Sequence, residues 1–313
     1  MMQEMQKDFI SIADLSSEQV RGLIDRAIAD KARFRAGDLG ASLSGRTLAM
    51  IFEKPSLRTR VSFEVAMTHL GGHAIYLAPA DIGLGSREPV IDIARVLGRM
   101  CDGVMARTFA HETVRQLAQH SPVPVINALS DLLHPCQAMA DLMTVQEHFE
   151  TLDGKTLLFV GDGNNVARSL AVACAKVGMK FILACPDGYQ LPEDFVASLR
   201  SENGPDCCTI TSDAKDAAAQ SDILYTDTWV SMGQEDEKQQ RIRDFENFKI
   251  DSELLSAAPD DAIVMHCLPA YRDLEITDAV FEAHAETIMN EAENRLHFQR
   301  TLLDTLIAGG GIG

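Results

Sequence analysis

A nine-residue run near the start of the chain concentrates side chains that bind anions. Phe52-Glu53-Lys54-Pro55-Ser56-Leu57-Arg58-Thr59-Arg60 carries two arginines and two hydroxyl groups directly after a short apolar stretch at 48–52. Proline suits a first helical turn, and serine accepts hydrogen bonds from first-turn amides. Unpaired amides, the helix dipole and guanidinium groups at one helix start favour a phosphate. The run therefore predicts a phosphate site; the alternative is a capped surface helix with two solvated arginines.

Two further motifs carry a histidine one or three positions before a proline. His134-Pro135-Cys136-Gln137 is predicted at the start of a helix, where His134 and Gln137 can face one way. His266-Cys267-Leu268-Pro269 follows an apolar stretch at 262–265 and would present a thiol at the carboxyl end of a strand. The alternative is that His134 is a helix cap or a core residue whose hydrogen bonds are made within the protein. This motif by itself therefore does not assign a function.

Polar residues also follow two other apolar stretches. Asp227 to Gly233 comes after 223–225 and contains the only tryptophan, and the charged stretch 234–243 after it is expected to be solvated and mobile. Gly161-Asp162-Gly163-Asn164-Asn165-Val166 resembles a dinucleotide-binding turn, but valine replaces the third glycine. We therefore favour a tight turn that offers Asn164 or Asn165 to a small polar ligand.

The elements that must position these motifs alternate between strand and helix. Such alternation predicts an α/β fold of two doubly wound parallel-sheet domains, with the active site in the cleft between them, because ligands bind at the carboxyl ends of the strands. We expect domains at 1–150 and 151–291, with a last helix at 292–306 that packs back onto the first. The expected strands are 48–52, 74–77, 103–106, 123–127, 156–160, 181–184, 208–210, 223–225 and 262–265. The expected helices include 90–100, 113–119 and 137–151.

Composition limits the classes of function. The chain has 313 residues, 46% of them hydrophobic, which suits two domains of roughly 150 residues. Its net charge of -18 argues against binding to nucleic acid, which requires a basic surface. No stretch has the length of a signal peptide core or a membrane span, and the seven scattered cysteines lack metal-type spacing. We expect a soluble, cytoplasmic protein with reduced thiols and no metal.

Five motifs in order resemble those of the carbamoyltransferases, and specifically the ornithine carbamoyltransferase family, over residues 8–306. They are Ser56-Leu57-Arg58-Thr59-Arg60, His134-Pro135-Cys136-Gln137, Asp227 through Ser231-Met232-Gly233, His266-Cys267-Leu268-Pro269 and Glu291-Ala292-Glu293-Asn294-Arg295. This family transfers the carbamoyl group of carbamoyl phosphate to the side-chain amine of ornithine, which gives citrulline and phosphate in arginine biosynthesis. It uses no metal or organic cofactor and is built on a homotrimer.

The resemblance implies a role for each matching residue. The phosphate and the transferred group would be bound by Ser56, Leu57, Arg58, Thr59 and Arg107. The carbamoyl portion would be held by His134, Gln137 and Arg295. The amino-acid end of ornithine would be bound by Asn165, Asp227, Ser231 and Met232. The reacting amine would face Cys267 and the Leu268 carbonyl. The catalytic set would be Cys267, Arg107, His134 and Asp227.

The chemistry of acyl transfer fits these roles. Negative charge develops on the carbamoyl oxygen, so donors aimed there in advance lower the barrier, and Thr59, Arg107 and His134 suit that task. The attacking amine, with a reference pKa of about 10.4, must first lose a proton. A Cys267 thiolate could accept that proton or orient the neutral amine, and the departing phosphate is another acceptor. The sequence does not distinguish between these routes for the proton.

Two positions depart from the family pattern. Leu57 stands where many members carry threonine, which leaves a backbone contact intact but removes a hydroxyl. Gly83 stands where many relatives place a glutamine that reaches the neighbouring subunit, although Ser86 or Arg87 could substitute.

Four alternatives differ in substrate or in class. Carbamoyl transfer to aspartate is disfavoured by the Cys267 motif. Transfer to putrescine or to an acylated ornithine is harder to distinguish from transfer to ornithine. A nicotinamide-dependent oxidoreductase rests only on the Gly161 turn. A non-catalytic amino-acid-binding protein would need a broken phosphate site.

Overall fold

The computed structural model describes residues 6–84, 87–230 and 235–313. The chain forms two compact units: unit 1 is Met1–Met143 with Asn294–Gly313, and unit 2 is Thr144–Glu293. The unit boundaries fall inside two helices, α6 (Pro135–Phe149) and α13 (Ala285–Leu303). The domain limits that the sequence suggested, 1–150 and 151–291, remain a prediction.

Unit 1 contains a four-stranded sheet in which every pair of neighbours is parallel. The strands are β1 (Thr47–Phe52), β2 (His73–Leu77), β3 (Gly103–Arg107) and β4 (Val125–Leu129), in the order β2-β1-β3-β4. All four were predicted, but β4 begins two residues later than expected. Pro124 lacks an N–H and contributes only its carbonyl, which accepts from the Val104 amide at 2.9 Å.

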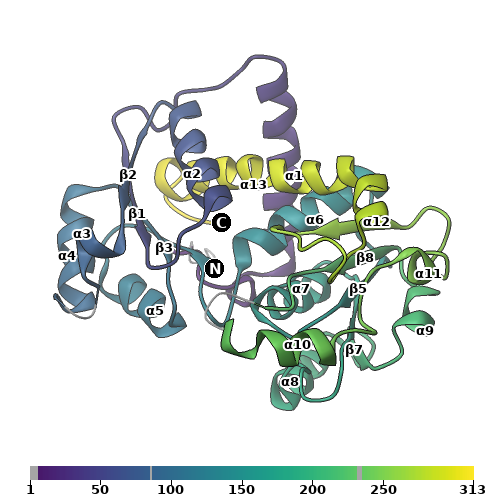
Figure 1. The fold of residues 1–313 in the computed structure, drawn as a ribbon. Helices are drawn as coiled ribbons and strands as arrows, with labels where there is room; N and C mark the ends of the chain where they lie inside the picture. The colour runs from purple at the N-terminus through teal and green to yellow at the C-terminus, as the bar shows by residue number, and fades with distance from the viewer. Residues whose placement is uncertain (1–5, 85–86, 231–234) are drawn as a thin grey trace. The chain divides into compact units, whose positions relative to one another are not determined.

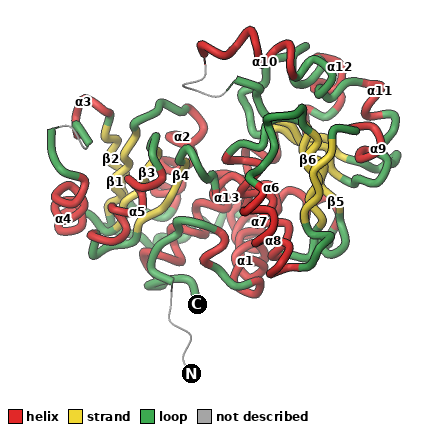
Figure 2. The backbone as a smooth tube through the Cα atoms, turned by 90° about the horizontal axis from the view of Figure 1, so that it is seen from below, coloured by secondary structure: helices red, strands yellow, loops and turns green. Residues whose placement is uncertain are grey.

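Both faces of this sheet are covered by helices. Ala49 and Ile51 of β1 pack in one apolar cluster with Ile93 of α4 (Val90–Met100) and Leu117 of α5 (His111–His120). Figures 1 and 2 show α4 and α5 on one side of the sheet and α2 (Leu57–His69) on the other. Because side chains alternate along a strand, a strand covered on both sides is apolar throughout, as β1 is.

Helix boundaries follow local capping chemistry. Ser16 and Gln19 form a capping box at the start of α1 (Ser17–Arg35), a helix that the sequence analysis did not identify. The helix predicted at 137–151 is α6, which begins earlier because Pro135 fits the first turn. The helix predicted at 292–306 is α13, which begins at Ala285 and continues as a π-helix at Asp304–Ala308. The remaining helical segments of unit 1 are Ile12–Asp14 and α3 (Pro79–Ile82).

Unit 2 contains a five-stranded parallel sheet in the order β7-β6-β5-β8-β9. Its strands are β5 (Thr156–Val160), β6 (Lys180–Ala184), β7 (Cys208–Thr211), β8 (Ile223–Thr226) and β9 (Ile263–His266). All five were predicted to within one residue at each end. The doubly wound fold class of both units is confirmed.

Helices cover both faces of this sheet as well. Figure 2 shows α7 and α8 on one side and α9 and α11 on the other. The helices are α7 (Asn165–Lys176), α8 (Glu193–Asn203), α9 (Ala214–Ala218), α10 (Lys238–Asp244), α11 (Ser252–Leu255) and α12 (Asp278–Ala283).

The charged stretch at 234–243 was expected to be solvated and mobile. Residues 236–240 and Arg243 are exposed, as expected, whereas Arg241 is buried; the mobility stays a prediction. Residues 235–237 form a 3-10 turn and 238–244 form α10. Arg241 is buried because its guanidinium binds Asp162 at 2.7 Å and Glu237 at 2.8 Å. A charge run that finds carboxylate partners can therefore fold against the domain.

Candidate functional site

The strand order of each unit has one point at which successive connections leave in opposite directions. This point lies between β1 and β3 in unit 1 and between β5 and β8 in unit 2. Ligands of open α/β sheets bind beyond the carboxyl ends of the strands at such points. The predicted residues Ser56 and Arg107 follow or end the first pair of strands, and Asn165 and Asp227 follow the second. Topology thus selects the same segments that the motifs selected.

The predicted phosphate segment is the start of α2. Ser56 is the N-cap, and its Oγ accepts from the Thr59 amide at 3.3 Å and lies 3.1 Å from the Thr59 hydroxyl. Thr59 is buried, whereas Leu57 is 75% exposed. The apolar residues Phe63 and Met67 anchor the helix in the core, as their spacing predicted. A helix start fixed in this way directs its first-turn amides toward an anion.

A cationic cluster of four residues lies in unit 1: Arg58, Arg107, His134 and Arg295. Burial, together with the charges of Arg295 and Arg58, lowers the pKa of Arg107 to about 10. Burial also lowers the pKa of His134 well below its usual range, and the same cations together with Arg107 lower it further. Arg107 Nε has no hydrogen-bond partner among the described residues. At neutral pH this cluster holds charged guanidinium groups beside an uncharged imidazole, which favours an anion.

The predicted residue Gln137 links α6 to α13. Arg295 donates from Nη1 to Gln137 Oε1 at 2.6 Å, and Gln137 donates from Nε2 to Asp141 at 2.7 Å. Gln137, Asp141 and Arg295 are all buried. The structure therefore brings together Gln137 and Arg295, which lie 158 positions apart in the sequence.

Asp227 of unit 2 is held by its neighbours after β8. It accepts from Asn164 Nδ2 at 2.9 Å and from the Thr228 amide at 2.7 Å. Asn164 is also the N-cap of α7, and its Oδ1 accepts from the Val166 and Ala167 amides. Asn165, predicted to bind ligand, is the first residue of that helix. A carboxylate fixed in place at the end of a strand suits a cationic ligand group.

The glycine turn before α7 has a structural explanation. A Cβ on Gly163 would lie 2.7 Å from the Leu191 amide nitrogen and 2.8 Å from the Tyr189 carbonyl oxygen. The Gly163 amide donates to that same carbonyl at 2.8 Å. Close backbone approach thus accounts for this glycine without a dinucleotide.

Two predicted ornithine-binding residues, Ser231 and Met232, lie outside the described residues, as does Ser86.

Cys267 follows β9 and is a buried free thiol, as are the six other cysteines. The residues on both sides of it are fixed: His266 Nδ1 accepts from the Leu268 amide at 2.9 Å, and Leu268 precedes a cis peptide bond to Pro269. Because Nδ1 accepts, Nε2 carries the proton and donates to Glu275 at 3.2 Å. The thiol thus sits on a backbone segment held by buried hydrogen bonds.

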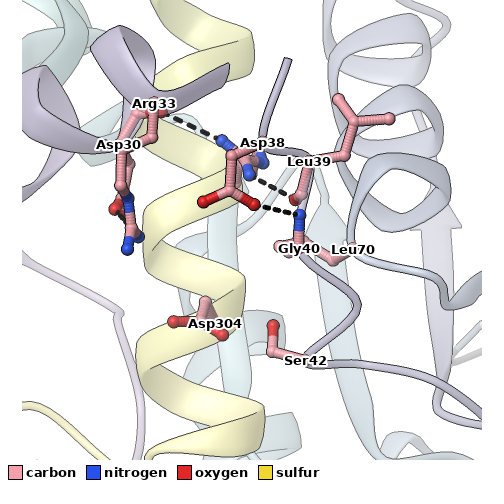
Figure 3. Close-up of a pocket in the computed structure, with 9 residues that line it drawn as sticks. Asp30, Arg33, Asp38, Leu39, Gly40, Ser42, Leu70 and Asp304 are labelled. Carbon is pink, nitrogen blue, oxygen red and sulfur yellow. Dashed lines mark hydrogen bonds and ion pairs between the residues drawn. The ribbon is translucent and has the colours of Figure 1, made fainter. Parts of the chain in front are cut away.

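Two cavities of about 140 Å³ lie outside these clusters, one in each unit. The unit 2 cavity is lined by Thr228, Trp229, Val230, Lys238, Ile242, Tyr271, Leu274 and Glu275. The unit 1 cavity, which we call the α1/α13 cavity, is lined by Asp30, Arg33, Asp38, Leu39, Gly40, Ser42, Leu70, Arg300 and Asp304 (Figure 3). Among the described residues no group of three histidine, cysteine, aspartate or glutamate side chains could hold a metal ion. None of the described helices is long and apolar enough to cross a membrane.

Comparison with known proteins assigns the chain to a family. Residues 7–147 match the family model described as aspartate/ornithine carbamoyltransferase, carbamoyl-P binding domain, and residues 153–306 match its Asp/Orn binding domain. The chain belongs to the aspartate/ornithine carbamoyltransferase family. This bears out the resemblance seen in the motifs.

Individual relatives agree over nearly the whole chain. An ornithine carbamoyltransferase of Methanosarcina acetivorans is 49% identical, with 96% of this chain and 98% of that protein covered. One from Oceanobacillus iheyensis is 44% identical, with 96% and 94% covered. A solved ornithine carbamoyltransferase structure from Pyrococcus furiosus aligns with a TM-score of 0.92 at 42% identity and covers 99% of each chain.

Sequence reasoning missed the residues that support the predicted ones. Asp141 lies four positions after Gln137 on α6, and Gln299 lies four positions after Arg295 on α13. Residues four apart share one helix face, so this spacing is a signal that could have found both. The function of such a supporting residue cannot be read from spacing alone, because Gln137 of α6 and Arg295 of α13 meet only in the packed fold.

Proposed function

We propose that this protein transfers the carbamoyl group of carbamoyl phosphate to the side-chain amine of L-ornithine, which gives L-citrulline and phosphate. The single observation that carries this proposal is the cationic cluster, in which burial and the charges of Arg295 and Arg58 lower the pKa of Arg107 and, together with Arg107, keep His134 uncharged. Such a cluster is stabilised by a dianionic ligand. Arg58, Arg107 and His134 lie in the part of the chain that matches a carbamoyl phosphate-binding domain, whereas Arg295 lies in the part that matches the Asp/Orn binding domain.

In the proposed mechanism each group has a separate task. The α2 start, with Ser56, Leu57, Arg58 and Thr59, binds the phosphate. Arg107 and the neutral His134 donate to the carbamoyl oxygen as negative charge develops there. A neutral imidazole can donate one hydrogen bond without adding a further charge to an already cationic site.

The ornithine half of the proposal rests on unit 2. Asp227 binds the α-ammonium group, Asn165 with Ser231 and Met232 binds the remaining amino-acid groups, and Cys267 with the Leu268 carbonyl faces the reacting amine. The fixed Asp227 carboxylate and the buried Cys267 thiol support these roles. The amine loses its proton to the Cys267 thiolate or to the phosphate group of carbamoyl phosphate. The nitrogen then bonds to the carbamoyl carbon, and the bond from that carbon to the phosphate oxygen breaks.

A citrulline-formation assay tests the substrate. Ornithine, acetylornithine, putrescine and aspartate are each offered with carbamoyl phosphate, and ornithine is expected to give the largest kcat/KM. A larger kcat/KM for putrescine or acetylornithine would show that the proposed substrate, ornithine, is wrong. Arg58→Ala is expected to abolish turnover, and near-normal kinetics in that variant would contradict the phosphate assignment.

We further propose a homotrimer that acts in cytoplasmic arginine biosynthesis. Support for assembly comes from exposed apolar side chains on α2 and on the edge strand β2, namely Val61 and Ile75. Seven free cysteines suit a reducing compartment. Light scattering should give three times the chain mass, and Ile75→Lys should lower it; a monomeric mass for the unaltered protein would refute the trimer.

A further inference from the structure

The guanidinium of Arg295 is held on two sides by carboxamides. Nη1 donates to Gln137 Oε1 at 2.6 Å. Gln299, oriented with its amide oxygen toward Arg295, accepts from Nε at 3.1 Å and from Nη2 at 2.9 Å. This orientation follows from the donors around it, because two N–H groups of Arg295 converge on one end of the amide. Gln299 is fully buried.

Each carboxamide is fixed at its nitrogen end. Gln137 Nε2 donates to Asp141 at 2.7 Å, and the nitrogen of Gln299 donates to Ser62 Oγ at 2.5 Å. The two amides cannot rotate without losing these bonds, so their oxygens stay directed at Arg295. The guanidinium therefore has a defined position before any ligand arrives.

The second amide also connects Arg295 to the predicted phosphate segment. Ser62 lies on α2, and its hydroxyl donates to the Thr59 carbonyl at 3.2 Å. Gln299 thus joins α13 to the first turn of α2 by way of Ser62. A shift of Gln299 would move Arg295 relative to the helix start that binds phosphate.

These acceptors orient Arg295 without neutralising it. An amide oxygen carries only a partial charge, whereas a carboxylate would pair with the guanidinium. The charge of Arg295 acts on the rest of the cluster, since it lowers the pKa of both Arg107 and His134. The geometry thus combines a fixed position with a positive charge that reaches neighbouring residues.

We propose that Gln299 is a positioning residue of the carbamoyl phosphate site: it fixes Arg295 with an uncharged acceptor, which adds no negative charge beside the anionic substrate. This inference rests on the proposed function for the identity of the substrate. In this proposal Gln299 itself does not contact the substrate.

Two variants of Gln299 distinguish the effect of a negative charge beside Arg295 from the effect of losing the hydrogen-bond acceptor. Gln299→Glu keeps the size and offers Arg295 a stronger acceptor, and the Ser62 hydroxyl can turn to donate to it. Gln299→Met keeps the approximate volume but removes the acceptor. A purely structural role predicts that methionine is the worse substitution, whereas the proposed role predicts that glutamate is the worse one. Gln119→Glu adds the same charge on the exposed face of α5 and is the matched control.

Inorganic phosphate is titrated by calorimetry into the unaltered protein and the three variants, with citrulline formation and Tm measured alongside. We expect Gln299→Glu to weaken phosphate binding at least tenfold without a lower Tm, Gln299→Met to weaken it less, and Gln119→Glu to stay within twofold. Phosphate affinity and kcat within twofold of the unaltered protein in Gln299→Glu, or a larger loss of affinity in Gln299→Met, would overturn the proposal.

The same experiment keeps the two proposals apart. If the unaltered protein binds phosphate but forms no citrulline, the proposed function fails, while the order of phosphate affinities still decides the role of Gln299. If Gln299→Glu does not fold, Gln299→Met decides alone: kcat and phosphate affinity within twofold of the unaltered protein, or a weakening that accompanies a lower Tm, would overturn the proposal, and a weakening of both at an unchanged Tm would support it.

Discussion

Unit 1 contains two buried arginine sites that differ in how their charges are matched. In the cationic cluster, Arg107 is buried near two other guanidinium groups, and its pKa falls. In the α1/α13 cavity, Arg300 donates to the backbone carbonyls of Asp30 and Leu39, and the Asp30 carboxylate pairs with Arg33.

Arg300 Nε, like Arg107 Nε, has no hydrogen-bond partner among the described residues, but the carboxylates of the cavity have partners. Arg26 pairs with Asp304, and Thr301 donates to Asp30 at 2.8 Å. Figure 3 shows the Asp38 carboxylate turned toward the Gly40 amide, a bond of 3.2 Å.

The difference teaches how to distinguish a binding site from a structural polar cluster. Burial of a charge costs free energy unless an opposite charge or good hydrogen bonds accompany it. The cavity meets that condition within the protein, whereas the cationic cluster places like charges together. A bound anion would compensate these charges, so the free energy of the cluster depends on an anionic ligand.

The largest effect is expected at Arg107. Arg107→Met should lower kcat/KM roughly 10²–10³-fold, because one donor to the developing charge is lost. It should also raise the free energy of unfolding by about 1 to 3 kcal/mol, because a buried like charge is replaced by an apolar side chain. Citrulline-formation kinetics and urea denaturation measure both. If Arg107→Met is less stable than the unaltered protein and equally active, the proposed difference between the cationic cluster and the α1/α13 cavity is wrong.

Arg300→Met should have the opposite effect on stability. The carbonyls of Asp30 and Leu39 lose a charged donor in a buried position, so the free energy of unfolding should fall by about 2 to 4 kcal/mol. The KM for carbamoyl phosphate should stay within twofold of the original value. Denaturation and kinetics at a temperature where the variant is folded provide the test, and a raised KM with unchanged stability would assign the cavity to the active site.

The imidazole of the cluster should make stability depend on pH. The folded-state pKa of His134 lies well below the value of about 6.5 expected in the unfolded chain. Between those two values the unfolded state binds more protons, so stability falls as pH falls below about 6.5, by at most about 1.4 kcal/mol per pH unit for this group. His134→Asn should flatten that slope between pH 7 and pH 5 in urea denaturation. Equal slopes in both proteins would show that His134 does not carry the effect.

The smallest effect is expected at Leu57. This side chain is 75% exposed, and its backbone position at the α2 start is unchanged by the residue type. Leu57→Thr should therefore change phosphate affinity less than threefold and stability by less than about 0.5 kcal/mol. A tenfold gain in phosphate affinity would indicate that a hydroxyl at this position contacts the anion and that this chain lacks a contact that many relatives have.

Much of the fold was predictable because strand and helix signals are local. Largely apolar runs of three to five residues gave all nine strands of the described residues, and Ser56 with Pro55 gave the start of α2. The first helix was missed although Ser16 and Gln19 form a capping box, a signal that is visible in the sequence. The order of α10 was missed because it depends on Arg241 meeting Asp162, a residue 79 positions away.

The sequence by itself determined which residues end strands or start helices, and thus which segments can bear a site. Only the tertiary structure decided that Arg107 is buried near the charges of Arg58 and Arg295, and that Gln299 and Gln137 hold Arg295 from two sides. The reason is physical: helix starts and strand ends depend on neighbours along the chain, whereas a pKa shift or an amide orientation depends on groups that only the packed fold brings together.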